Sequence, residues 1–224
     1  KKLSLLLFAF SAPFLFAQTP CSGGFAAGFP CDGYDLQGHI EIIDMGGKAY
    51  SGNNPMEATD SWGWTDPMDG KEYAIICMND GTAFVDVSVP TAPRFLGRVE
   101  SHTSTSWWRD VKVYNNHAYI VSDSNGNHGV QIFDLTRLRG LTTSPGANAS
   151  MRTFSTDGRY SGVSNAHNVI INEDSGYLYI LGSNRNSGGP RILNLNTSLT
   201  NPPVAGNING LGYCHDAQVV IYDG

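Results

Sequence analysis

The stretch Ala83-Phe84-Val85-Asp86-Val87 decides the fold, because its pattern returns twice further along the chain. The later copies are Gln131-Ile132-Phe133-Asp134-Leu135 and Arg191-Ile192-Leu193-Asn194-Leu195. Each copy follows a glycine-containing turn and, before that turn, another apolar strand. Strand units that repeat about every 40–50 residues are typical of a β-propeller, in which each repeat folds as one small sheet called a blade. The sequence therefore predicts an all-β propeller of four-stranded blades.

The same pattern divides the chain into consecutive blades. The expected ranges are 62–99, 108–154 and 166–208, followed by the opening strand of a fourth blade at 215–222. In the second range, we expect the closing strand near residues 151–154. A closed propeller needs about 4–8 blades. We therefore expect this chain to be an incomplete N-terminal part, about three blades plus the first strand of a fourth, truncated at the C-terminus.

Residues 1–17 resemble a secretory signal peptide. Lys1-Lys2 supplies the charged start, an apolar run follows, and Ala17 is the small residue expected at a cleavage site. The run is interrupted by Ser11 and Pro13 and is shorter than the roughly 20 residues of a membrane-spanning helix, so an uncleaved anchor is the weaker alternative. No other segment could cross a bilayer. We expect a secreted, extracellular protein with no transmembrane segment in the mature chain.

The next segment, 18–60, contains a glycine-rich loop between two cysteines, and the blades occupy 61–224. Export to an oxidising compartment favours a Cys21–Cys31 disulfide across this short loop. Cys77 and Cys214 lie on apolar strands, and we expect them to be buried free thiols, although the sequence leaves their pairing open. Residues 35–42 resemble the outer strand of the first blade. They either close the ring as the outer strand of the last blade or form an irregular extension.

Composition narrows the classes of partner. The formal net charge is −6, with 14 lysines and arginines against 20 aspartates and glutamates, and there is no basic run. Such a chain offers phosphates no counter-charge, so we expect no nucleic-acid partner. The chain has no Gly-x-Ser-x-Gly motif and no glycine-rich phosphate loop before a helix. Nothing in the sequence therefore indicates nucleophilic catalysis or nucleotide binding.

Polar residues recur where the first strand of each predicted blade begins, and ring geometry would bring them around one axis. The candidates for ligand binding are Asp66, Arg109, Asp110, His167, Asn168, His215 and Asp216. Imidazole and carboxylate groups also suit a divalent metal, for which Asp110, His167, His215 and Asp216 are the candidates. No tight His-x-x-x-His or Cys-x-x-Cys spacing supports this metal, and no other cofactor is expected. The favoured interpretation is structural: such side chains can bind the backbone of the neighbouring blade.

Two further features carry alternatives of the same kind. The four tryptophans could form an aromatic rim for a carbohydrate, or they could pack between blades, which is the favoured interpretation: Trp62, Trp64, Trp107 and Trp108. Of these, Trp64 and Trp108 are the candidates for ligand binding. Residues 123–129 together with Asp134 have the oxygen-ligand spacing of a calcium loop, but His128 stands where such a loop needs glycine. A hairpin turn is the simpler interpretation of this segment.

The chain resembles bacterial secreted proteins built from LVIVD repeats, in particular the choice-of-anchor B family. The motifs that carry the resemblance are the Cys21–Cys31 loop with Asp35-Leu36, then residues 62–66, 79–87, 90–93, 108–114, 165–168 and 215–218. The resemblance implies an extracellular propeller that a C-terminal module, expected in the missing part, attaches to the cell surface. It implies no catalytic residues.

Two functions follow from these observations. The first is a noncatalytic binding or scaffold module whose partner is an extracellular protein or glycan. The alternative is a propeller enzyme, hydrolytic or metal-assisted, with its site at the mouth of the channel, using Asp110, His167, His215 and Asp216. The absence of a catalytic motif favours the first function.

Overall fold

The computed structural model describes residues 18–48, 57–146, 148 and 150–222. The predicted signal peptide, residues 1–17, lies outside them. The described residues form an all-β protein with two short 3-10 turns and no α-helix. None of the helices in this part of the chain is long and apolar enough to cross a membrane. The all-β prediction is confirmed.

Residues 18–39 form a small unit of their own together with residues 90–92. Its strands β1 (Phe25–Ala26) and β2 (Phe29–Pro30) make a two-residue hairpin. The predicted Cys21–Cys31 disulfide is present, with 5.9 Å between the Cα atoms. Of the segment 35–42, Leu36 makes an isolated bridge with Thr19, and the rest has no strand structure. A ring-closing role for this segment stays a prediction.

The second unit comprises residues 40–89 and 93–222 and contains three larger sheets. The first sheet contains β3 (Ala58–Thr65), β4 (Glu72–Met78), β5 (Gly81–Asp86), β6 (Arg94–Glu100) and β10 (Thr153–Phe154), in the spatial order β10-β6-β5-β4-β3. The first four strands form an antiparallel meander. They correspond to the first predicted repeat.

The other two sheets repeat the same meander. The second contains β7 (Arg109–Tyr114), β8 (His117–Ser122), β9 (Val130–Asp134) and β11 (Gly158–Tyr160). The third contains β12 (Asn168–Asn172), β13 (Tyr177–Leu181), β14 (Arg191–Asn194) and β15 (Val204–Asn207). Tight turns join the strands: Asn115 and Asn116 have φ of 44° and 60°, which asparagine tolerates in two-residue hairpin turns.

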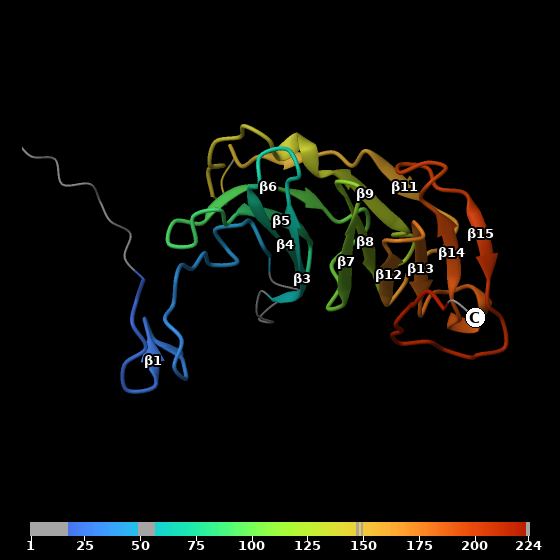
Figure 1. The fold of residues 1–224 in the computed structure, drawn as a ribbon, viewed down its shortest axis with the longest axis horizontal. Coiled ribbons are helices and arrows are strands. Elements are labelled where there is room, and N and C mark those ends of the chain that lie inside the picture. The colour runs from blue at the N-terminus through green and yellow to red at the C-terminus, as the bar shows by residue number, and fades with distance from the viewer. Residues whose placement is uncertain (1–17, 49–56, 147, 149, 223–224) are drawn as a thin grey trace, which may run out of the picture. The chain divides into compact units, whose positions relative to one another are not determined.

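The first strands of the three sheets lie side by side. In Figure 1, β3, β7 and β12 follow one another across the middle of this unit, and β3 contacts β7 as β7 contacts β12. Apolar side chains fill the spaces between the sheets. Phe84 on β5 stacks on Phe133 on β9 at 4.5 Å between ring centroids, and Tyr119 on β8 shares a core with Leu178 on β13. Each pair of consecutive sheets therefore has its own hydrophobic core.

The predicted closing strand of the second sheet was wrong. Residues 153–154 instead pair in parallel with β6 of the first sheet, and residues 158–160 close the second. Two features explain why residues 153–154 pair with the first sheet and not with the second. Gly97 (φ 142°) leaves room for Phe154, because a Cβ there would lie 2.7 Å from its ring. Phe154 then packs 5.2 Å from Phe133 and 6.1 Å from Phe84.

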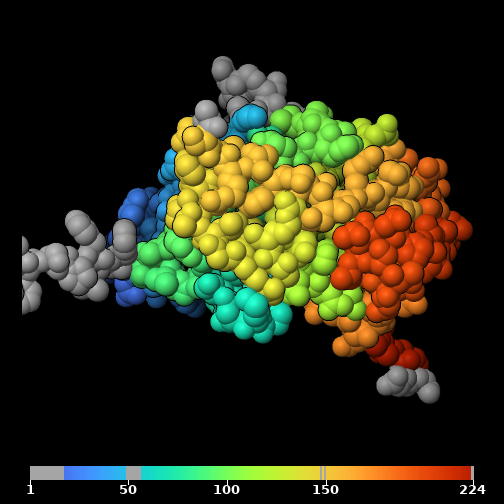
Figure 2. All heavy atoms as spheres, turned by 90° about the horizontal axis from the view of Figure 1, so that it is seen from above, coloured from blue at the N-terminus to red at the C-terminus, as the bar shows by residue number. Residues whose placement is uncertain are grey.

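The connection from β9 to β11 therefore crosses from the second sheet to the first and returns. In the space-filling view its described residues form a yellow to light-orange band at the surface (Figure 2). Its residue Arg152 donates to the Thr142 carbonyl at 2.9 Å, and its amide nitrogen donates to Ser144 Oγ at 2.8 Å. The predicted strand at 215–222 is not formed, because a strand needs a hydrogen-bonded neighbour and none of the described residues supplies a ladder partner for it.

The two remaining cysteines are unpaired, as expected, but only one is buried. Cys77 on β4 is fully buried, and burial raises the pKa of its thiol to about 12. It behaves as a small apolar core residue. Cys214 is partly exposed, so its predicted burial was wrong. It lies directly before residues 215–222, which form no strand.

Candidate functional site

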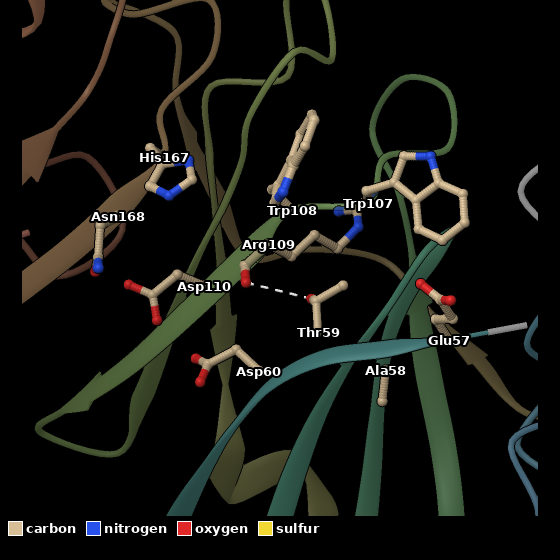
Figure 3. A pocket seen from close by; sticks show the side chains of 10 residues that line it. All are labelled: Glu57, Ala58, Thr59, Asp60, Trp107, Trp108, Arg109, Asp110, His167 and Asn168. Carbon is tan, nitrogen blue, oxygen red and sulfur yellow. Dashed lines mark hydrogen bonds between the residues drawn. The ribbon is translucent and has the colours of Figure 1, made fainter. Parts of the chain in front are cut away.

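A cleft of about 400 Å³ opens where the first strands of the three sheets begin. Figure 3 shows its walls, which come from the starts of β3, β7 and β12 and from the residues just before each of these strands. The cleft is lined by Glu57, Ala58, Thr59, Asp60, Trp107, Trp108, Arg109, Asp110, His167 and Asn168. Five of the predicted ligand-binding candidates lie together here: Trp108, Arg109, Asp110, His167 and Asn168.

Asp66 does not belong to this group, so its placement with the others at a strand start was wrong. Because β3 runs from Ala58 to Thr65, Asp66 follows its far end. There it is fully buried, and Arg139 binds it through two hydrogen bonds of 2.6 and 2.7 Å. These bonds lower the pKa of Asp66. The residue that matches Asp110 on the first sheet is Asp60.

The two tryptophans predicted as ligand-binding candidates, Trp64 and Trp108, have different environments. Trp64 is 6% exposed, stacks on Tyr73 at 4.9 Å and donates its indole N–H to Asn116 at 3.1 Å. It is a packing residue, so the rim interpretation was wrong for it. Trp108 is 50% exposed and lines the cleft. An exposed indole beside polar groups offers an apolar face to a ligand.

Asp110 connects the second sheet to the third. Its Oδ2 accepts the amide of Val169 at 2.7 Å, and its Oδ1 accepts the amide of Val111 at 2.8 Å and the ammonium of Lys112 at 2.6 Å. Burial raises the pKa of Asp110 to about 6, and a side-chain hydrogen bond with Asp60 adds to the rise. The carboxyl group thus joins two neighbouring strands at the floor of the cleft.

Asp60 repeats this connection one sheet earlier. Its Oδ2 accepts the amide of Val111 at 3.3 Å and lies 3.9 Å from the Lys112 ammonium. In Figure 3 the carboxyl groups of Asp60 and Asp110 lie in the same part of the cleft. Each carboxylate therefore binds the amide that follows its counterpart on the next sheet. This agrees with the favoured interpretation of the polar residues as structural.

Arg109 lies behind the cleft wall and is 3% exposed. Its guanidinium donates to Ser101 Oγ at 2.6 Å and to Nε2 of His128 at 3.1 Å. The His128 ring donates from Nδ1 to the Gly129 carbonyl at 3.0 Å, which leaves Nε2 as the acceptor. Burial, and then the charge of Arg109, lower the pKa of His128 to about 4. His128 is therefore neutral near pH 7.

His167 is fixed by a residue for which the sequence suggested another role. Its Nδ1 bonds Asp123 Oδ2 at 2.9 Å, and Asp123 Oδ1 accepts the side-chain amide of Asn165 at 3.2 Å. Asp123 was a calcium-loop candidate, but here its carboxylate orients an imidazole. The ring of His215 lies 4.1 Å from that of His167, centroid to centroid. His215 and Asp216 are exposed and lie outside the cleft lining.

The predicted metal ligands do not form a chelating group. Within the part of the chain that the structure describes, no cluster of three or more His, Cys, Asp or Glu side chains could hold a metal ion. Of the four candidates, His167 and His215 contact each other, while Asp110 is bound by backbone amides and Lys112. Asp216 Oδ1 accepts the amide of Ala217 at 2.8 Å.

Sequence reasoning missed Glu57 and Asp60, and it suggested a different role for Asp123. Asp60 had a signal, because Thr59-Asp60-Ser61 aligns with Arg109-Asp110-Val111 at the same position of the repeat. Glu57 had no such signal, nor did the contact of Asp123 with His167, because these residues flank strands and reach the site only through the fold. Comparisons with known protein families and with curated proteins find no match to this chain.

Proposed function

We propose that this chain is part of a secreted β-propeller that binds an extracellular glycan in the cleft at the start of its first strands. The observation that supports this proposal most strongly is the open cleft with the half-exposed Trp108 indole on its wall. The proposal includes the resemblance to LVIVD-repeat proteins of the choice-of-anchor B family. Surface attachment through a C-terminal module is part of the same proposal.

The repeated geometry of the sheets supports the propeller. The starts of β3, β7 and β12 meet at one cleft, and their far ends line another, which includes Trp64, Tyr114 and Glu173. The three first strands therefore run in the same direction, as blades around a common axis require. Residues 215–222 form no strand in this structure, and in this proposal they lead into a fourth blade.

The chemistry of the cleft supports a carbohydrate ligand. An indole face packs against the C–H face of a sugar ring, and the neighbouring polar groups can bind hydroxyl groups. Asp60 is partly exposed, and Glu57 makes no hydrogen bond from its side chain to another described residue. Thr59 donates to the Arg109 carbonyl at 3.3 Å and keeps its lone pairs for a ligand.

Acid–base catalysis has less support. Both oxygens of Asp110 are occupied by backbone amides and by Lys112, so this carboxyl group is committed to holding the sheets. The hydroxyl of Thr59 is the only one among the ten described side chains that line the cleft, and it bonds to a carbonyl. A hydroxyl nucleophile with its own base is therefore not assembled from these side chains.

A glycan array probed with the chain tests the proposal. Trp108→Ala should weaken binding at least about tenfold, because truncating an exposed tryptophan in a cleft removes a dominant contact. Trp62→Ala is the matched control: Trp62 is 40% exposed on β3 but lies outside the cleft, under Lys112 at 4.5 Å. Equal loss in both variants would contradict the assigned site. If the chain binds no glycan on the array but captures a protein in a pull-down, the assigned ligand class would be contradicted.

Secretion is supported by the disulfide of the small unit. The Cys21–Cys31 bond belongs to an oxidising compartment. Expression of the chain with residues 1–17 should deliver the protein, cleaved after Ala17, outside the cytoplasm. Mass spectrometry of the exported material would then find a mature N-terminus at Gln18. Retention of residues 1–17 would contradict the signal-peptide assignment.

A further inference from the structure

One buried acceptor at the start of β12 has no donor among the described residues: Oδ1 of Asn168. Its counterparts on the two preceding sheets are both used. Asp60 accepts the amide of Val111, and Asp110 accepts the amide of Val169. A buried oxygen without a hydrogen bond is costly, so the repeat predicts a third amide for Asn168.

The alignment of the repeats identifies that amide. Arg109-Asp110-Val111 and His167-Asn168-Val169 align with His215-Asp216-Ala217. The Ala217 amide donates to its own neighbour, Asp216 Oδ1, at 2.8 Å. The Val111 amide donates to Asp110 Oδ1 at the same distance and in addition to Asp60. Ala217 therefore shows the first half of the arrangement seen at Val111.

The segment that carries Ala217 already lies along β12. The rings of His167 and His215 are 4.1 Å apart, and these two residues hold the same position in the repeat. Further along, the side-chain amide of Asn172 donates to the Val219 carbonyl at 3.5 Å, within one residue of the aligned position. Two contacts at the two ends of β12 thus give the segment the direction of a first strand and place it within one residue of the aligned register.

We propose that residues 214–220 dock along β12 as the next first strand, with Asn168 Oδ1 accepting the Ala217 amide, and that His215 and Asp216 thereby extend the wall of the cleft. This inference rests on the proposed blade arrangement and deepens it. It assigns Asn168 as the docking residue. It also adds a second imidazole beside His167, so the ligand meets polar groups from four consecutive strands.

Amide hydrogen exchange, measured by NMR on the whole chain, tests the docking without any ligand. The Ala217 amide should be protected, and Asn168→Leu should lower its protection about fivefold, the effect of one ordinary hydrogen bond. Asn168→Asp keeps an acceptor and should preserve the protection. The Val169 amide, held by Asp110, is the internal control for folding and should not change. If Asn168→Leu does not fold, Asn168→Ser serves in its place, because the shorter serine side chain cannot reach the Ala217 amide.

Exchange of Ala217 at the rate of an unstructured amide, or protection that Asn168→Leu leaves unchanged, would overturn the docking. The extension of the cleft has a separate test: His215→Ala should reduce binding on the glycan array about tenfold, and unchanged binding would overturn it. If the unaltered chain binds no glycan while Ala217 responds to Asn168, the proposed function fails and the docking stands.

Discussion

His128 is the residue whose ionisation the fold controls most directly. It is fully buried and accepts a hydrogen bond from Arg109 through Nε2. Protonation would remove that acceptor and place a second cation beside the guanidinium. The folded protein therefore keeps this ring neutral down to a pH of about 4, the pKa of His128, whereas an unfolded histidine takes up a proton below about pH 6.5.

We predict that this difference destabilises the protein in acid. Between pH 6.5 and 4 the unfolded state binds one more proton than the folded state, so stability falls with decreasing pH, by about 3 kcal/mol over this window. Asp110, with its raised pKa, acts in the opposite direction between about pH 6 and 4. The free energy of unfolding is therefore measured in urea at pH 7.5 and at pH 4, for the unaltered chain and for His128→Gln. The contribution of His128 is the difference between the two proteins in how much this free energy changes with pH. An equal pH dependence in both proteins would contradict the assignment.

The strand β10 shows how an element can be taken over by a neighbouring sheet. It is two residues long, yet Phe154 reaches a cluster with Phe84 and Phe133 that joins the first two sheets. The guanidinium of Arg137 lies over the Phe133 ring at 4.9 Å and over the Phe154 ring at 5.7 Å. The exposed edge of β6 is thereby covered, which protects it from pairing with other chains.

Truncating this cluster should destabilise the protein in proportion to burial. Phe84→Ala removes a fully buried ring and should cost about 4 kcal/mol, and Phe154→Ala, at a partly exposed position, should cost about 2 kcal/mol. Val89→Ala, at an exposed site, is the control and should stay within about 0.5 kcal/mol of the unaltered chain. These values are read from chemical denaturation. A Phe154→Ala variant as stable as the control would show that β10 is not docked on β6.

At the scale of the whole molecule, the features of the fold that depend on local sequence pattern could be predicted. The alternation of apolar residues and the turns at Asn115-Asn116 fix the hairpins, because each strand pairs with its neighbour in the chain. Three sheets and the order of their first three strands could therefore be foreseen. The exchange of β10 could not, because it depends on the space that Gly97 leaves for a side chain from another sheet.

The cleft was predictable only in part. The recurrence of polar residues located Asp110, His167 and Asn168, since repeats place equivalent positions together. The Trp62-Gly63-Trp64 motif predicts a strand that starts at Trp62 and therefore points to Asp66, whereas the strand begins at Ala58 and has Asp60 near its start. The partnership of Asp123 with His167 joins two loops and leaves no local pattern.

The central claim is that consecutive first strands face one another in order, each held by the acidic side chain of the one before. Hydrogen exchange at Val111 and Val169 tests it most directly, in the unaltered chain and in Asp60→Ala and Asp110→Ala. We predict a crossed result: Asp60→Ala speeds exchange at Val111 but not at Val169, and Asp110→Ala has its larger effect at Val169. Exchange at Val169 that does not respond to the loss of the Asp110 carboxylate would contradict the claim.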